Sequence, residues 1–99
     1  MTEIHQQPKQ IQKINCHDLY KNRNTYSIEE LIHNIDDLQI KIILHTQTLN
    51  AEFCAKYILD EKRTTCIEDY YLIDIGYVLR HQKHINRDEL EYYYDLYNL

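Results

Sequence analysis

The histidines and cysteines of this chain are residue types that hold metal ions in proteins. His81 and His84 are three positions apart near a predicted helix end, and Cys54 and Cys66 lie upstream. The spacing Cys-x11-Cys-x14-His-x2-His lacks the close cysteine pair that is typical of zinc modules. We therefore interpret the cysteines as small buried side chains and the histidines as favourable groups at a helix C-terminus. The sequence predicts no metal and no cofactor.

A cysteine nucleophile would need a positioned base and a stabilised thiolate. Cys66 stands in the first turn of a predicted helix, which favours the thiolate, but Glu68 and Asp69 oppose that effect. The adjacent pair Cys16-His17 falls in a segment without sustained periodicity. No glycine-rich phosphate loop, paired-histidine metalloprotease motif or nucleophile elbow is present. The sequence predicts no catalytic residues and indicates that the protein is not an enzyme.

Two predicted helices flank the turn from His81 to Asn86, an arrangement that also occurs in helix-turn-helix proteins. The second helix offers four acidic residues and one basic residue, Arg87. A DNA-recognition helix needs basic and amide side chains toward the groove. We interpret the pair as two packed helices and predict no direct binding of nucleic acid.

The C-terminal segment concentrates aromatic residues, with four of the ten tyrosines in the last eight positions. On a helix after Asn86, one predicted core-facing stripe contains Leu90, Tyr93, Tyr94 and Tyr97. A second apolar stripe lies on the other side. Ordinary exposed residues at a chain end would explain it. The alternative is a partner site, because tyrosine is enriched in binding hot spots. We predict five partner-binding residues: Tyr92, Leu96, Leu99, Glu89 and Asp95.

Charge is distributed unevenly along the chain. Residues 1–24 carry a net charge of +2 and residues 25–99 a net charge of −7, which gives −5 overall. An acidic folded part suits a basic protein surface better than a phosphate backbone. The 43% hydrophobic content is ordinary for a single globular domain. No apolar run is long enough for a membrane span.

Three cysteines without an export signal predict a cytoplasmic protein. The single glycine and single proline, beside an excess of Ile, Tyr and Asn, indicate an AT-rich genome such as those of many viruses, phages and mobile elements.

The elements that must position these residues are predicted from caps and periodicity. Residues 1–25 are polar with isolated apolar positions, so we predict a loosely ordered arm with a short turn near His17 to Tyr20. Ser27 with Glu30 forms a capping-box pattern, and apolar residues then recur at helical spacing from 28 to 49. Residues 38–44 also alternate as in a strand, but no Gly or Pro separates them from the preceding helix. We favour a helix there.

Further caps predict the remaining helices. Asn50 could end the first helix or cap a second one, which would carry Phe53, Cys54, Tyr57 and Ile58 inward. Capping-box patterns at Thr65 with Glu68 and at Asn86 with Glu89 would begin two more. Gly76 lies inside the third helix, where it would allow a neighbouring helix to approach closely.

The predicted fold is all-α: a small antiparallel bundle of about four helices over residues 26–99, preceded by the polar arm of residues 1–25. The predicted function is that of a small acidic intracellular protein-interaction module, a regulator or inhibitor of viral or phage type that binds a larger, basic-surfaced protein. One alternative is an acidic blocker of a nucleic-acid-binding protein. Another is a homodimer through the long first helix.

Overall fold

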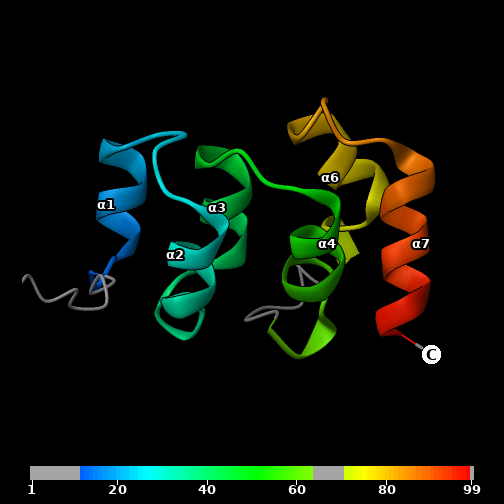
Figure 1. The fold of residues 1–99 in the computed structure, drawn as a ribbon, viewed down its shortest axis with the longest axis horizontal. Helices are drawn as coiled ribbons and strands as arrows, with labels where there is room; N and C mark the ends of the chain where they lie inside the picture. Colours follow the sequence, from blue (N-terminus) through cyan, green and yellow to red (C-terminus); the bar gives the residue numbers. More distant parts are fainter. Residues whose placement is uncertain (1–11, 64–70, 99) are drawn as a thin grey trace, which may run out of the picture.

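The computed structural model describes residues 12–63 and 71–98 of the chain, and Figure 1 shows its helices in chain order. Within these ranges the chain forms helices and no strand, which confirms the predicted all-α class. The elements are α1 (Cys16–Lys21), α2 (Ile28–His33), the 3₁₀ turn η1 (Ile35–Asp37), α3 (Ile40–Thr46), α4 (Ala51–Phe53) with its π-helical continuation η2 (Cys54–Ile58), the 3₁₀ turn η3 (Glu61–Arg63), α6 (Ile75–His81) and α7 (Arg87–Tyr97).

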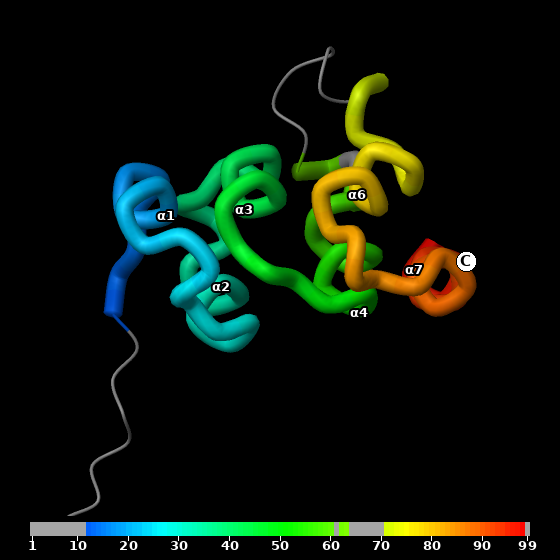
Figure 2. The backbone as a smooth tube through the Cα atoms, turned by 90° about the horizontal axis from the view of Figure 1, so that it is seen from above, coloured from blue at the N-terminus to red at the C-terminus, as the bar shows by residue number. Residues whose placement is uncertain are grey.

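The helices are shorter than the predicted bundle requires, and a regular four-helix antiparallel bundle is not confirmed. Helices α1, α2, α3 and α6 span six or seven residues each, whereas α7 spans 11. Helix α1 packs against α3, α3 packs against η2 and α6, and α7 packs against η2, α4 and α6. Figure 2 shows α1 to α3 on one side of the molecule and α4, α6 and α7 on the other.

Residues 12–25 contain helix α1 at the place of the turn predicted near His17 to Tyr20, and two of their side chains are buried. Ile14 is 3% exposed and Leu19 is fully buried. Helix α1 begins with a capping box, in which the Asn15 side chain accepts from the Asp18 amide and the Asp18 carboxylate accepts from the Asn15 amide. A six-residue helix is too short to show a periodicity in the sequence. The pattern Asn15-x-x-Asp18 was the available signal.

The predicted helix over residues 26–49 begins as expected and then breaks. Ser27 and Glu30 form both hydrogen bonds of the capping box. Helix α2 ends at the capping residue Asn34, η1 follows, and Leu38 and Gln39 are extended before α3 begins. The alternation over residues 38–44 therefore marks a break followed by a helix, not a strand. The homodimer hypothesis was based on one long first helix, and the structure has α2, η1 and α3 in its place.

The buried amide of Asn34 explains where that break occurs. Its Oδ1 accepts from the Ile14 amide at 2.9 Å, and its Nδ2 donates to the carbonyls of Gln12 at 3.1 Å and Glu30 at 2.9 Å. Asn34 thus ends α2 and attaches the N-terminal segment at the same point.

Gln47 attaches the connection between α1 and α2 in the same manner. Its Nε2 donates to the carbonyls of Leu19 and Asn22, at 3.3 and 3.1 Å. Its Oε1 accepts from the amides of Thr25 and Tyr26, at 3.2 and 3.1 Å. This one side chain therefore satisfies one carbonyl of α1 and three main-chain groups of the connection that follows it.

Gln82 joins the end of α6 to the end of α3. Its Oε1 accepts from the Leu49 amide at 2.9 Å, and its Nε2 donates to the carbonyls of Leu44 and Gln47 at 2.9 and 2.8 Å. We refer to Asn34, Gln47 and Gln82, each at most 4% exposed, as the buried amides.

The third predicted helix is only partly within the described residues. The Thr65–Glu68 capping box lies outside them. Ile73 is not helical, and α6 begins at Ile75 with the Asp74 carboxylate accepting from the Tyr77 amide. Among the described residues, a methyl group placed at Gly76 would meet only Asp74 Oδ1 within 4 Å, at 3.5 Å, so no described helix approaches this glycine closely.

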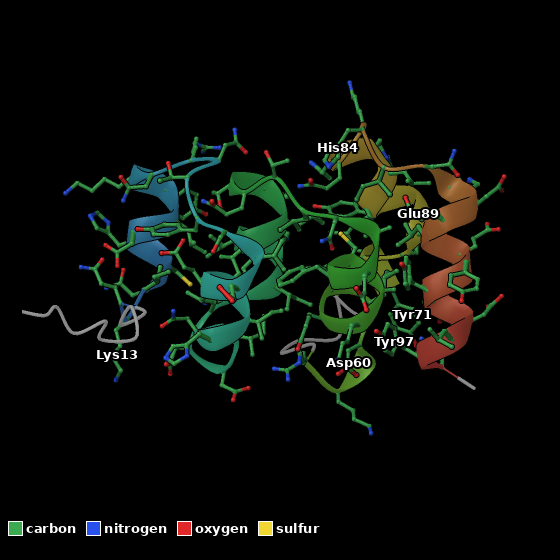
Figure 3. All side chains as sticks on the ribbon, viewed as in Figure 1. Lys13, Asp60, Tyr71, His84, Glu89 and Tyr97 are labelled. Carbon is green, nitrogen blue, oxygen red and sulfur yellow. The ribbon has the colours of Figure 1, made fainter. Side chains whose placement is uncertain are left out.

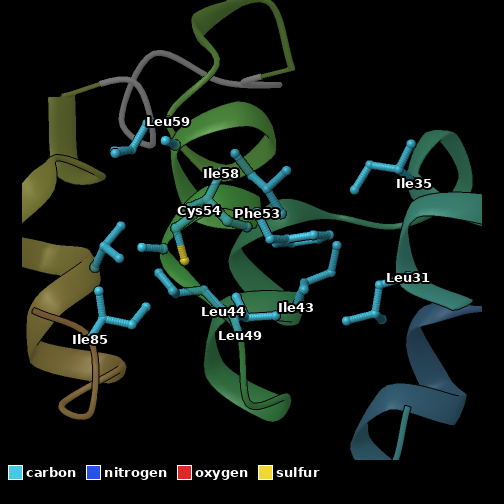
Figure 4. Packing of buried hydrophobic residues seen from close by; sticks show 14 of the residues in the cluster. Leu31, Ile35, Ile43, Leu44, Leu49, Phe53, Cys54, Ile58, Leu59 and Ile85 are labelled. Atoms are coloured by element: carbon cyan, nitrogen blue, oxygen red, sulfur yellow. The ribbon is translucent and has the colours of Figure 1, made fainter. Parts of the chain in front are cut away.

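The hydrophobic core extends across the described helices (Figure 4). Phe53, Cys54 and Ile58 are buried, as predicted, and Tyr57 is partly buried against them. The Asn50 side chain accepts from the Phe53 amide at 2.8 Å, so of its two predicted roles Asn50 has that of the cap of this helix. The core positions α4 and η2 as the surface on which α7 packs.

Candidate partner-binding site

Helix α7 is held to the rest of the molecule along one side. The Asn86 side chain accepts from the amides of Asp88 and Glu89 and caps the helix. Leu90 is fully buried, and Tyr93 and Tyr94 are partly buried against the core. The predicted core-facing stripe is therefore correct for these three residues.

Tyr97, the fourth member of that stripe, lies at its edge and is 38% exposed. Its hydroxyl donates to Glu52 Oε2 at 2.6 Å, and Lys56 Nζ lies 5.5 Å from the centre of its ring. The hydrogen bond to the Glu52 carboxylate raises the pKa of Tyr97 above its usual value. The last turn of α7 is thus attached to α4 by a polar contact at the surface.

The opposite side of α7 exposes two large apolar side chains. Tyr92 is 62% exposed and Leu96 is 48% exposed. The Tyr92 ring makes an edge-on contact with Tyr93, with 5.2 Å between ring centres. Asp95 is also exposed on this helix, and Leu99 lies outside the described residues. We call the surface formed by Tyr92, Leu96 and Asp95 the outward face of α7.

Glu89, the remaining predicted site residue, lines a recess beside α7 (Figure 3). This recess has a volume of about 220 Å³ and lies between the start of α4, the loop before α7 and α7 itself. We call it the acidic recess; its lining residues are Leu49, Asn50, Ala51, Glu52, His84, Ile85, Glu89 and Tyr93. Nothing in the sequence pairs Glu52 with Glu89, because only the packing of α4 against α7 brings them to one recess.

The residues considered for metal binding do not converge within the described part of the chain. There, no group of three or more His, Cys, Asp or Glu side chains is arranged to hold a metal ion. His84 Nε2 is hydrogen-bonded to the Leu49 carbonyl. His81 instead stacks on His45, with 4.2 Å between ring centres. Cys66 lies outside the described residues.

The surroundings of Cys54 and His45 shift the pKa values of these two residues. Burial raises the pKa of the Cys54 thiol to about 12, so this residue remains a thiol at neutral pH. His45 Nε2 lies 2.8 Å from the Tyr77 hydroxyl. Burial, and then the nearby charges of His81, Lys41 and Arg23, lower the pKa of His45. This pair of stacked imidazoles forms part of the contact between α3 and α6.

None of the helices in residues 12–63 and 71–98 has the length and apolar character needed to cross a membrane. In comparisons with protein-family models, with curated proteins and with solved structures, the chain shows no significant match.

Proposed function

We propose that this protein is a small acidic interaction module that binds a larger protein through the outward face of α7 and thereby regulates or inhibits it. One observation carries the proposal: Tyr92 and Leu96 are exposed on a helix whose other side is fixed by the fully buried Leu90. A helix that is anchored on one side presents its outer side chains in a defined geometry, so a partner loses little conformational freedom in binding it.

The chemistry of this face suits a protein partner. An exposed tyrosine offers a large apolar ring and a polar hydroxyl, the combination that is enriched in binding hot spots. Asp95 lies on the same face, and Asp88 and Glu89 lie in the first turn of α7. Carboxylates around an apolar centre favour a partner with a basic surface and disfavour an acidic one.

The proposal is tested by the double substitution Tyr92→Ala with Leu96→Ala. The wild-type protein, used as bait in extract of its native host, should retain a partner that mass spectrometry identifies, and the double variant should lose that partner. Circular dichroism should show unchanged helicity, because both side chains are exposed. Tyr20→Ala is the matched control, since Tyr20 is 52% exposed on α1; it should retain the partner. Loss of helicity in the double variant would place these side chains in the core and contradict the proposal.

A second candidate is an acidic blocker of a nucleic-acid-binding protein, and it is favoured by the charge of α7. This helix has four carboxylates and one cation, and the cation Arg87 is within 3.3 Å of Glu91. A blocker that presents carboxylates in place of phosphates should bind its target with a steep dependence on salt. Binding of the purified partner that is equally tight at low and high salt would argue against this candidate.

A further inference from the structure

Two carboxylates and one imidazole, that of His84, line the acidic recess. Glu52 and Glu89 line it, and none of the described lining residues is Lys or Arg. Both carboxylates stand in the first turn of a helix, where the positive end of the helix dipole attracts negative charge. Two carboxylates at one small recess repel each other, and a cation placed between them would remove that repulsion.

The described cations on α4–η2 and α7 do not line the acidic recess, although Lys56 shares a neighbouring pocket with Glu52. Arg87 is paired with Glu91 on the other flank of α7. Lys56 lies over two tyrosine rings, 5.5 Å from the centre of each. Glu52 is held in place by the Tyr97 hydroxyl at 2.6 Å, so its charge is fixed at the edge of the recess. The Tyr93 ring also lines the recess, and aromatic rings attract cations.

The recess and the outward face lie on adjacent parts of one helix. Glu89 and Leu96 are seven positions apart, which corresponds to about two helical turns and about 10 Å along the axis of α7. A second helix has the same rise per residue. An arginine and a leucine seven positions apart on such a helix would therefore meet Glu89 and Leu96 together.

We propose that the partner docks as a basic amphipathic helix, which places an arginine or lysine side chain into the acidic recess and an apolar side chain against Tyr92 and Leu96. This inference rests on the proposed function and specifies the chemistry of the partner. The recess selects for positive charge, and the outward face supplies the apolar contact.

The probe is a fluorescein-labelled, helix-stabilised peptide of roughly 18 residues, long enough to form a stable helix. It carries Leu and Arg seven positions apart. A second peptide replaces Arg by Gln, and a third has the same composition with the Arg moved to the opposite side of the helix. Fluorescence anisotropy at low salt should show the Arg peptide binding about tenfold more tightly than the other two, as expected for loss of two exposed ion pairs.

The protein variants remove one carboxylate at a time, either at the acidic recess or, as a control, on the other flank of α7. Glu89→Gln and Glu52→Gln should each weaken the Arg peptide about three- to fivefold and leave the Gln peptide unchanged. Gln at position 52 can still accept from Tyr97, so its effect is one of charge. Glu91→Gln, on the other flank, should change binding less than about twofold.

Three results would overturn the inference: no measurable binding of the Arg peptide, equal binding of the Arg and Gln peptides, or equal effects of Glu89→Gln and Glu91→Gln. A different result would contradict the proposed function. If Tyr92→Ala with Leu96→Ala leaves the native partner bound, the interaction module itself is wrong. If that variant loses the native partner while Glu52→Gln and Glu89→Gln bind the purified partner as tightly as the wild type, the interaction module stands and the basic helix is wrong.

Discussion

The interior around the buried amides encloses polar side chains, whereas the outward face of α7 exposes apolar ones. Inside, polar groups are almost completely enclosed, and Asn34, Gln47 and Gln82 each form three or four hydrogen bonds to main-chain groups. On the outward face, the large apolar side chains of Tyr92 and Leu96 remain in solvent. The polar groups of the interior form their hydrogen bonds within the molecule, whereas the apolar side chains of the outward face remain exposed to solvent.

This difference separates what folds the chain from what is available to a partner. Isolated helices of six or seven residues are unstable in water, so α1, α2, α3 and α6 depend on tertiary contacts. The buried amides supply such contacts at the ends of these helices. Helix α7 needs only one side for its attachment, and its other side is free to serve binding.

The largest expected effect compares two leucines on α7. Leu90→Ala should lower the free energy of unfolding by about 3 kcal/mol, because it creates a cavity at a fully buried position. Leu96→Ala should change it by less than about 0.5 kcal/mol, as expected for an exposed residue. Urea unfolding followed by circular dichroism measures both. Equal effects would remove the distinction between the two sides of α7.

The next effect tests the interior. Gln82→Leu keeps the approximate size of the side chain but leaves the Leu49 amide and the carbonyls of Leu44 and Gln47 without their partner. We expect the free energy of unfolding to fall by about 2 kcal/mol, the cost of unsatisfied buried groups. Gln39→Leu, at an exposed position, is the control and should have little effect. An unchanged urea midpoint in Gln82→Leu would show that the buried amides do not stabilise the fold.

Local signals in the sequence were sufficient to predict the helices with strong caps. Ser27 with Glu30 begins a helix as predicted, and so does Asn86, although only the Asn86 half of the predicted box with Glu89 is formed. Asn50 takes one of its two predicted roles, that of a helix cap. The division of α7 into two sides also followed from spacing, and the burial of Leu90 beside the exposure of Tyr92 agrees with it. These features depend on contacts within one or two turns, which a single sequence contains.

The features that were missed depend on contacts between distant segments. Asn34 and Gln47 have the composition of surface residues, and only their partners in residues 12–26 make them interior. The break after α2 was missed for that reason, because hydrophobic spacing continues through it. The acidic recess was missed for the same reason, since Glu52 and Glu89 line one recess only because α4 packs on α7.

A smaller effect concerns pH and the contact between α3 and α6 at His45. The pKa of His45 is lowered, first by burial and then by His81, Lys41 and Arg23. Below its usual value of about 6.5, the unfolded chain therefore binds a proton that the folded chain resists, so stability is complete above that pH and decreases as the pH falls through it. The wild type should lose more stability than His45→Gln between about pH 7.5 and 5.5. Parallel losses would contradict this interpretation.

The smallest effect lies where the two regions meet, at the contact between Tyr97 and Glu52. Because the carboxylate raises the pKa of Tyr97, replacing it with a neutral acceptor should bring that pKa back toward 10.0. NMR titration of ring-labelled tyrosine should show this for Glu52→Gln. Glu91→Gln, on the other flank of α7, should leave the Tyr97 titration unchanged. An identical curve in Glu52→Gln and the wild type would mean that Glu52 is not fixed beside the recess, and a partner's cation would then lose one of its two carboxylates.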